Sequence, residues 1–485
     1  MVVPAELTIP LSGCSTTPVL RQVLEDHLEP FVERVEESEG NPRVPSFVLR
    51  ELRAMRDCSD FTRGFWRLRC DACKADRVVP FTCHARLCPC CAGRMMADRA
   101  AHLADRGLPH APFRQWVQTF PSELARHLAF DADLAAAVIR VFIRIIFDWQ
   151  CARAAATATA PPGSAAHPGA MVWIQRFSDG AGIYFHLHAL VPDGIFRERE
   201  GSLAMDFVRL PPPTDGDIAS LVRRFATRTA GLLTRRLRRS ASHHSATDES
   251  GATANSTPEA AGMFLHRCAQ SLARTIAEPA GPPAANRRLL RRRSKPLCAR
   301  HADFELHAAV RVSTDDRSGL ERLCRYLARP ALASGRLRRL PDGRIELQLK
   351  RVWRGGVRKL LFEPDALIAR LCALVPPPRF HLIRAFGILS NASALRPYIL
   401  PTLPDSKHRG VPTAPPRPAQ MRWADLMLRT FRRDVTVCPC GGRLRMLAAI
   451  TQPNVAEAIA AAIILSSQRR ARPPPRPPRP VPPTR

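Results

Sequence analysis

Clustered cysteines are the feature of this chain that most limits how it can fold. Seven of the fifteen cysteines lie within 34 positions, from Cys58 to Cys91. Two pairs, Cys70-x2-Cys73 and Cys88-x2-Cys91, have the spacing of a four-thiolate zinc site, because two residues between thiolates form a turn that points both sulfurs at one ion. Thiolates favour zinc over magnesium or calcium. The spacing therefore predicts one structural Zn²⁺ held by these four cysteines.

Neighbouring residues keep other ligand sets open. Cys90 adjoins Cys91, and Cys83-His84 offers further donors, so a two-metal cluster is an alternative to a single ion. The odd number of cysteines and the lack of a signal-peptide pattern favour reduced thiols over disulfides. No stretch of about 18 residues is apolar and free of charge, as a membrane-spanning helix requires. We therefore expect a soluble, cytoplasmic chain without membrane contact.

Positive charge is the second strong feature. The chain has 73 Lys and Arg against 43 Asp and Glu, a formal net charge of +30. Such an excess opposes compaction unless the partner is a polyanion, either nucleic acid or an anionic membrane surface. Arginines, Arg86 and Arg94 among them, surround the cysteines. The zinc-binding region is therefore expected to bind phosphates of DNA.

Composition and periodicity divide the chain into five segments. Strands are expected at 111–120, 170–177 and 183–191, and helices at 134–149 and 221–240, which is typical of an α+β domain. The tail is rich in Pro and Arg and contains no acid, so it is expected to be disordered. The expected segments are a helical arm at 1–44, a zinc-binding domain at 45–110, an α+β domain at 111–400 with a loosely ordered insertion at 240–297, a helical segment with a degenerate cysteine motif at 401–465, and the tail at 466–485.

One expected strand carries two histidines on the same face. Alternation along 183–191 places apolar side chains on one side and His186 and His188 on the other. Two imidazoles at positions i and i+2 can converge on one divalent ion. Taken alone, the pattern is more often the polar outer face of a half-buried strand.

Only three tyrosines occur, and one of them lies on a basic helix flank. In the expected helix at 317–329, Tyr326 stands off the apolar stripe on the side shared with Arg322 and Arg329. Its hydroxyl would meet whatever the arginines attract, such as a phosphate. The alternative is an amphipathic tyrosine at a domain surface.

Together, these elements form an ordered series that resembles a known family. The series runs through GFWRLRCDACKADRVVPFTCHARLCPCCAGRMM, LPHAPFRQWVQTFP, IQRF, FHLHALVPDGIF, FELHAAVRV, ERLCRYLARPALASGRL and LVPPPRFHLIRAFGILS. In this order, over roughly residues 20–450, the chain resembles the transposases of rolling-circle insertion sequences, the family numbered ninety-one. The catalytic domain of that family belongs to the HUH single-strand nucleases.

The resemblance implies a fold and a chemistry. The fold would be an N-terminal zinc ribbon followed by an HUH core, an antiparallel sheet with helices on one side. His186 and His188 would hold Mg²⁺ or Mn²⁺, with Gln175 on the neighbouring strand as a candidate third ligand. Tyr326 would attack a phosphodiester of single-stranded or hairpin DNA and form a 5′-phosphotyrosine. Arg322 and Arg329 would hold the flanking phosphates, and the protein would associate with a bacterial nucleoid.

Two departures from the family qualify this interpretation. Some members carry a second tyrosine four residues before the first, where this chain has Arg322. The family's C-terminal C-x2-C motif is Cys438-Pro439-Cys440 here, one residue short, which suggests either a degenerate second metal site or a decayed copy of a mobile element. Two alternatives therefore stay open: a non-catalytic, zinc-dependent DNA-binding regulator, and an HUH replication initiator or relaxase.

Overall fold

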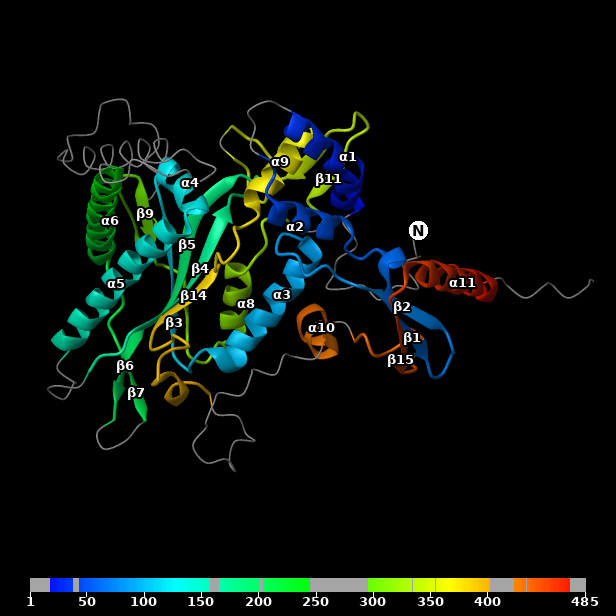
Figure 1. Cartoon of the computed structure of the whole chain (residues 1–485). Helices are drawn as coiled ribbons and strands as arrows, with labels where there is room; N and C mark the ends of the chain where they lie inside the picture. The colour runs from blue at the N-terminus through cyan, green and yellow to red at the C-terminus, as the bar shows by residue number, and fades with distance from the viewer. Residues whose placement is uncertain are drawn as a thin grey trace, which may run out of the picture.

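In a computed structural model, two of the four sheets that the described residues form lie at opposite sides of the molecule (Figure 1). The structure describes residues 18–37, 43–157, 165–199, 204–244, 295–333, 335–353, 355–401, 423–432 and 434–471. The larger sheet has seven strands, and a three-stranded sheet lies beside helix α11. Antiparallel sheets combined with helices confirm the predicted α+β class.

The seven-stranded sheet is the scaffold of the expected catalytic region. Its strand order is β14-β4-β5-β3-β9-β8, with β10 paired to β3, and all its pairs are antiparallel. The central strands β3, β4 and β5 correspond to the three strands expected from sequence. The bounds are β3 (Phe113–Thr119), β4 (Gly169–Phe177), β5 (Ile183–Pro192), β8 (Cys298–His301), β9 (Phe304–His307), β10 (Arg311–Val312) and β14 (Ile383–Gly387).

Three helices cover one face of this sheet: α4 (Ser122–Phe130), α5 (Ala132–Ala156) and α6 (Asp215–His244). The Asp131 side chain caps α5 by accepting a 2.8 Å hydrogen bond from the Leu134 amide. Alternate side chains of β5, including Phe185 and Leu187, are fully buried against these helices. The other side chains of β5 therefore point to the opposite face.

Two more helices pack on that opposite face: α3 (Pro89–His102) and α8 (Arg317–Leu327). The apolar stripe of α8 includes Leu323 and Leu327, which share a buried cluster with Trp173 of β4 and Leu190 of β5. A single π turn, η2 (Leu103–Gly107), follows α3. Helices thus lie on both faces of the sheet rather than on one. The second face buries the apolar stripe of the amphipathic helix α8.

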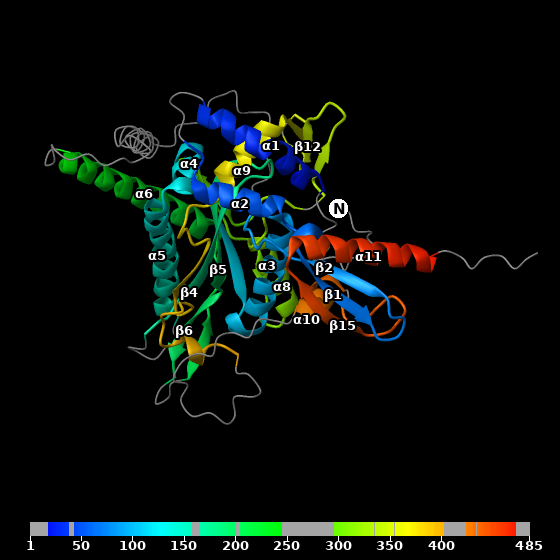
Figure 2. The same ribbon diagram turned by 45° about the vertical axis from the view of Figure 1, so that its right-hand side comes forward.

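The smaller sheet joins residues from both ends of the chain. Its strands are β1 (Phe65–Cys70), β2 (Asp76–Pro80) and β15 (Leu444–Ile450), in the order β15-β1-β2. Helix α11 (Pro453–Ala471) buries Ala456 and Ala460 against Phe65 and the short helix η1 (Phe61–Arg63). Figure 2 shows α11 alongside this sheet. A strand close to the C-terminus therefore completes a sheet that begins near residue 65.

A third packed region connects the N-terminal helices to later segments. Helices α1 (Pro18–Glu37) and α2 (Ser46–Arg56) share one apolar cluster with α9 (Pro364–Leu374) and with the strands β11 (Leu337–Arg339), β12 (Ile345–Gln348) and β13 (Lys359–Phe362). The remaining elements are β6 (Gly194–Glu198), β7 (Met205–Arg209), η4 (Arg396–Tyr398) and α10 (Trp423–Phe431).

The expected loosely ordered insertion and the expected disordered tail fall largely outside the described residues. Most of the insertion expected at 240–297 lies there, although α6 continues to His244. Helix α11 extends to Ala471, beyond the expected start of the tail at residue 466, and residues 472–485 are not described. In the described part of the chain, every helix is too short or too polar to cross a membrane.

Candidate metal centres and catalytic site

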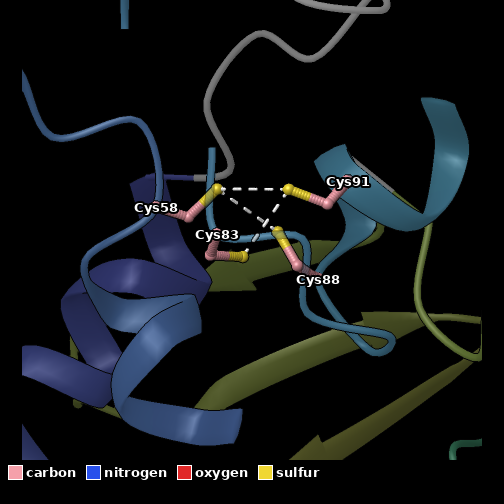
Figure 3. Close-up of side chains that lie close together, drawn as sticks. All are labelled: Cys58, Cys83, Cys88 and Cys91. Atoms are coloured by element: carbon pink, nitrogen blue, oxygen red, sulfur yellow. Dashed lines mark hydrogen bonds between the residues drawn. The ribbon is translucent and has the colours of Figure 1, made fainter. Parts of the chain in front are cut away.

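Four cysteine sulfurs converge between α2, β2 and α3. The thiols of Cys58, Cys83, Cys88 and Cys91 lie within 4.8 Å of one another (Figure 3). Neighbouring sulfurs are 3.6–3.7 Å apart. A regular tetrahedron with Zn–S bonds of about 2.3 Å separates its sulfurs by about 3.8 Å. The spacing of the four sulfurs therefore fits a closed zinc site.

Local backbone conformation aims these sulfurs at one point. Ser59 and His84 directly follow two of the cysteines and have positive φ angles of 60° and 55°, which turn the chain sharply. The amide of His84 donates to Cys91 Sγ at 3.3 Å.

The structure corrects the expected ligand set. Cys88 and Cys91 belong to this cluster, but Cys70 and Cys73 lie at the turn between β1 and β2. The five residues of β2 separate the two ends of the hairpin by roughly 17 Å at 3.3 Å per residue. Each C-x2-C pair therefore forms its own turn, but the two pairs lie too far apart to bind the same ion. Sequence spacing missed Cys58, for which the only signal was its nearness to the cluster.

The two histidines of β5 lie on the face that α8 partly covers. His186 is 7% exposed and His188 is 3% exposed, and their ring centroids are 4.9 Å apart. Nδ1 of His186 is 3.0 Å from the backbone oxygen of Tyr184, so it donates there and leaves Nε2 as the basic nitrogen. Nδ1 of His188 is 2.8 Å from the side-chain amide of Gln115 on β3. Nothing in the local sequence around Gln115 marks it as a partner of a histidine.

Two buried polar atoms beside the histidines lack a partner among the described residues. One is Nε2 of His188, and the other is Oε1 of Gln175. Gln175 lies directly opposite His186 across the β4–β5 pair, and its Nε2 donates to the Leu327 carbonyl at 2.9 Å. Buried polar atoms normally have a partner. An unpaired imidazole nitrogen and an unpaired amide oxygen on neighbouring strands are both groups that can bind a divalent cation.

Burial keeps both imidazoles neutral. Desolvation lowers the pKa of His186 to about 4, and it lowers the pKa of His188 to about 2. The charge of Arg329 acts in the same direction on both. Neutral imidazole is the form that binds metal, so both rings are ready ligands at pH 7.

The expected nucleophile contacts the histidine pair. Tyr326 is 43% exposed on α8, and its ring centroid is 5.9 Å from that of His188. The Arg329 guanidinium stacks over the tyrosine ring at 4.8 Å. Asp316 caps α8 by accepting from the Gly319 amide at 2.7 Å, which fixes the start of the helix. The fold thus brings the tyrosine, one flanking arginine and the histidines to one place.

The other arginines expected to bind DNA are spread over the surface. Arg322 is exposed on α8, where it lies 3.7 Å from Asp316. Arg86 is exposed in the loop before Cys88. Arg94 is half-buried and lines a pocket of about 480 Å³ on the smaller sheet. None of these three has a described contact with the histidine pair.

The chain combines a cysteine-rich domain that fits zinc with an α+β domain in which two paired histidines face a tyrosine. These features define a zinc-binding protein with a second polar site. Two family comparisons identify it further. The model described as "Transposase zinc-binding domain" matches residues 23–120, and the model described as "Putative transposase" matches residues 169–396. The chain therefore belongs to the insertion-sequence transposases of family ninety-one. No curated protein and no solved structure matches it.

Several functional statements follow from membership of this family. The chain is a transposase that contains structural zinc, and its partner is DNA. The first match includes Cys58, Cys83, Cys88 and Cys91, and the second includes the histidine pair and Tyr326. The matched ranges end before Cys438, so neither of them includes the C-terminal cysteines.

Proposed function

We propose that this transposase cleaves and rejoins single-stranded DNA through a covalent 5′-phosphotyrosine on Tyr326, with a divalent cation held by His186 and His188. The observation that carries the proposal is the 5.9 Å contact between the rings of His188 and Tyr326, which lie on different elements. A nucleophile and a cation-binding pair must meet at one phosphate, and this contact supports such a meeting.

The residues present fit a divalent cation. His186 has its Nδ1 satisfied by a backbone oxygen, while Nε2 of His188 and Oε1 of Gln175 are buried without a described partner. We propose these three side chains as the ligands. Mg²⁺ or Mn²⁺ bound there supplies a Lewis acid that polarises the scissile phosphate.

The protein side chains then carry the transfer. The Tyr326 phenol loses its proton and its oxygen bonds to phosphorus, while the bond to the 3′ oxygen breaks and that oxygen takes a proton. Arg329, stacked over the ring at 4.8 Å, attracts the phosphate. A 3′-hydroxyl of another strand reverses the step, so rejoining needs no ATP. Because position 322 is Arg322, one tyrosine serves successive transfers.

Burial at the site favours a single-stranded substrate. The imidazoles are less than a tenth exposed, whereas Tyr326 is 43% exposed above them. A phosphate must therefore pass the edge of α8 to reach the imidazoles. A single strand bends easily enough to do this, while a duplex is stiff over about 150 base pairs.

The test is covalent adduct formation on long single-stranded DNA of mixed sequence, with and without Mn²⁺. The expected result is a Mn²⁺-dependent adduct that disappears in Tyr326→Phe and persists in Tyr398→Phe, which removes the hydroxyl of another exposed tyrosine. Peptide mapping of the wild-type adduct should place the nucleotide on Tyr326.

Two results would contradict the proposal. An adduct that persists in Tyr326→Phe but disappears in Tyr184→Phe would move the nucleophile to Tyr184, whose ring is 5.2 Å from His186. Duplex binding without Mn²⁺ and without any adduct would instead indicate a non-catalytic DNA-binding protein.

A further inference from the structure

A second group of four cysteines lies at the closed end of the β1–β2 hairpin. The thiols of Cys70, Cys73, Cys438 and Cys440 lie within 4.8 Å of one another. Cys70 Sγ is 3.5 Å from Cys440 Sγ, and Cys73 Sγ is 3.8 Å from Cys438 Sγ. These separations match the roughly 3.8 Å between sulfurs of a zinc tetrathiolate.

The backbone forms the same kind of turn here as in the first centre. Lys74 follows Cys73 with a φ of 57°, and Gly441 follows Cys440 with a φ of 85°. In the first centre, Ser59 and His84 occupy the equivalent positions with positive φ angles. The Gly441 amide donates to the Cys438 carbonyl at 2.8 Å, which closes a tight turn across the single residue between the cysteines. The shorter Cys-x-Cys motif therefore still directs both sulfurs to one side.

Strand pairing delivers the C-terminal turn to the hairpin. Leu444 of β15 pairs with Cys70 of β1, and the Asp71 amide donates to the Arg443 carbonyl at 2.8 Å. Gly442 lies between the two turns, where an added Cβ would be 2.7 Å from Cys70 Sγ. Only glycine allows the turns to approach this closely.

The surroundings suit bound thiolates. The Arg77 guanidinium is 3.8 Å from Cys438 Sγ and offsets negative charge there. A neighbouring guanidinium is typical of the electropositive environments in which cysteines are deprotonated.

We propose that Cys70, Cys73, Cys438 and Cys440 bind a second structural Zn²⁺, which fastens β15 to the zinc-binding domain. The chain would then contain two closed zinc sites, one at each end of the β1–β2 hairpin. This inference needs neither the histidine pair nor Tyr326, so it stands apart from the proposed cleavage mechanism.

Zinc content of the full-length protein, purified under reducing conditions, tests the proposal. We expect about two Zn²⁺ per wild-type chain and about one in Cys438→Ser/Cys440→Ser. The matched control, Cys83→Ser/Cys88→Ser, removes two ligands of the first centre and should also retain about one. Cobalt substitution should give tetrathiolate absorption bands whose intensity falls by about half in either variant.

Alkylation of the wild-type protein gives a second measurement that does not depend on a variant folding. Cys73 and Cys440 are exposed, so as free thiols they would react quickly with N-ethylmaleimide. We expect their alkylation to be at least about tenfold slower before zinc is chelated than afterwards. One zinc per wild-type chain, full zinc content in Cys438→Ser/Cys440→Ser, or equal alkylation rates with and without chelator would each overturn the inference. A disulfide between these cysteines in the native protein would overturn it as well.

Discussion

Replacing Gln115 with leucine should weaken the divalent-cation site without touching a proposed ligand. The Gln115 amide is 2.8 Å from Nδ1 of His188, and both side chains are nearly fully buried. When Nε2 of His188 binds a cation, the ring proton resides on Nδ1, and the Gln115 amide, turned to present its oxygen, accepts it. Gln115→Leu removes that acceptor in a place that water does not reach.

The expected magnitude follows from this one contact. Loss of a hydrogen-bond partner behind a metal-binding histidine typically costs about 10–100-fold in metal affinity. That factor equals roughly 1.4–2.7 kcal/mol, and it agrees with the roughly 1–3 kcal/mol for leaving one buried polar group unpaired. Gln115→Glu retains an acceptor for the Nδ1 proton and should restore most of the affinity.

The assay is a Mn²⁺ titration followed by electron paramagnetic resonance, because Mn²⁺ competes poorly for the cysteine thiolates. Gln118→Leu is the matched control. Gln118 lies on the same strand and is fully buried, but it pairs with Leu187 on the opposite face of the sheet. Equal Mn²⁺ affinity in Gln115→Leu, Gln118→Leu and the wild type would refute the role assigned to Gln115.

Two stability predictions concern groups around the same helix and strand. Arg429 of α10 donates to the largely buried Glu321 at 2.6 Å, so Arg429→Ala should lower the free energy of unfolding by roughly 1–3 kcal/mol in urea denaturation. Arg199→Ala breaks an ion pair with Asp206 that is exposed to solvent, so its effect should be smaller. A smaller effect for Arg429→Ala than for Arg199→Ala would contradict this. The pKa values of His186 and His188 in the folded protein lie below the value near 6.5 in the unfolded chain, so the unfolded chain takes up protons first as the pH falls. In the absence of a divalent cation, the free energy of unfolding should therefore decrease as the pH drops from 6.5 toward 4. Urea denaturation at pH 7 and pH 5 should show a smaller loss in His186→Gln/His188→Gln than in the wild type, and equal losses would refute the assignment.

Local periodicity was sufficient to predict on which side of their own strand or helix the histidines and the tyrosine lie. Strand alternation places His186 and His188 on one face because a β-strand has no other way to direct its side chains. The helical stripe of α8 likewise leaves Tyr326 exposed beside Arg329, as the structure has it. Both predictions depend only on neighbours within a few residues.

Long-range pairing decided what periodicity could not. The division of the cysteines into two groups of four depends on the length of β2 and on the pairing of β15 with β1. Neither is encoded in the sequence near Cys70. Gln115 joins the histidine site because β3 pairs with β5 in one particular register. A sequence pattern that spans a few residues carries no information on such registers.

The pairing of β15 with β1 also sets an order for biosynthesis. Cys438 follows Cys73 by 365 residues, which a ribosome adds in roughly 20–70 s. Throughout that interval β1 has an open edge where β15 will bind, and Phe65 lacks the cover of α11. Open strand edges pair readily with other chains. A truncated product that ends before residue 444 would keep this edge permanently and is expected to aggregate, so translation must pass Ile450, the last residue of β15, before this sheet is closed.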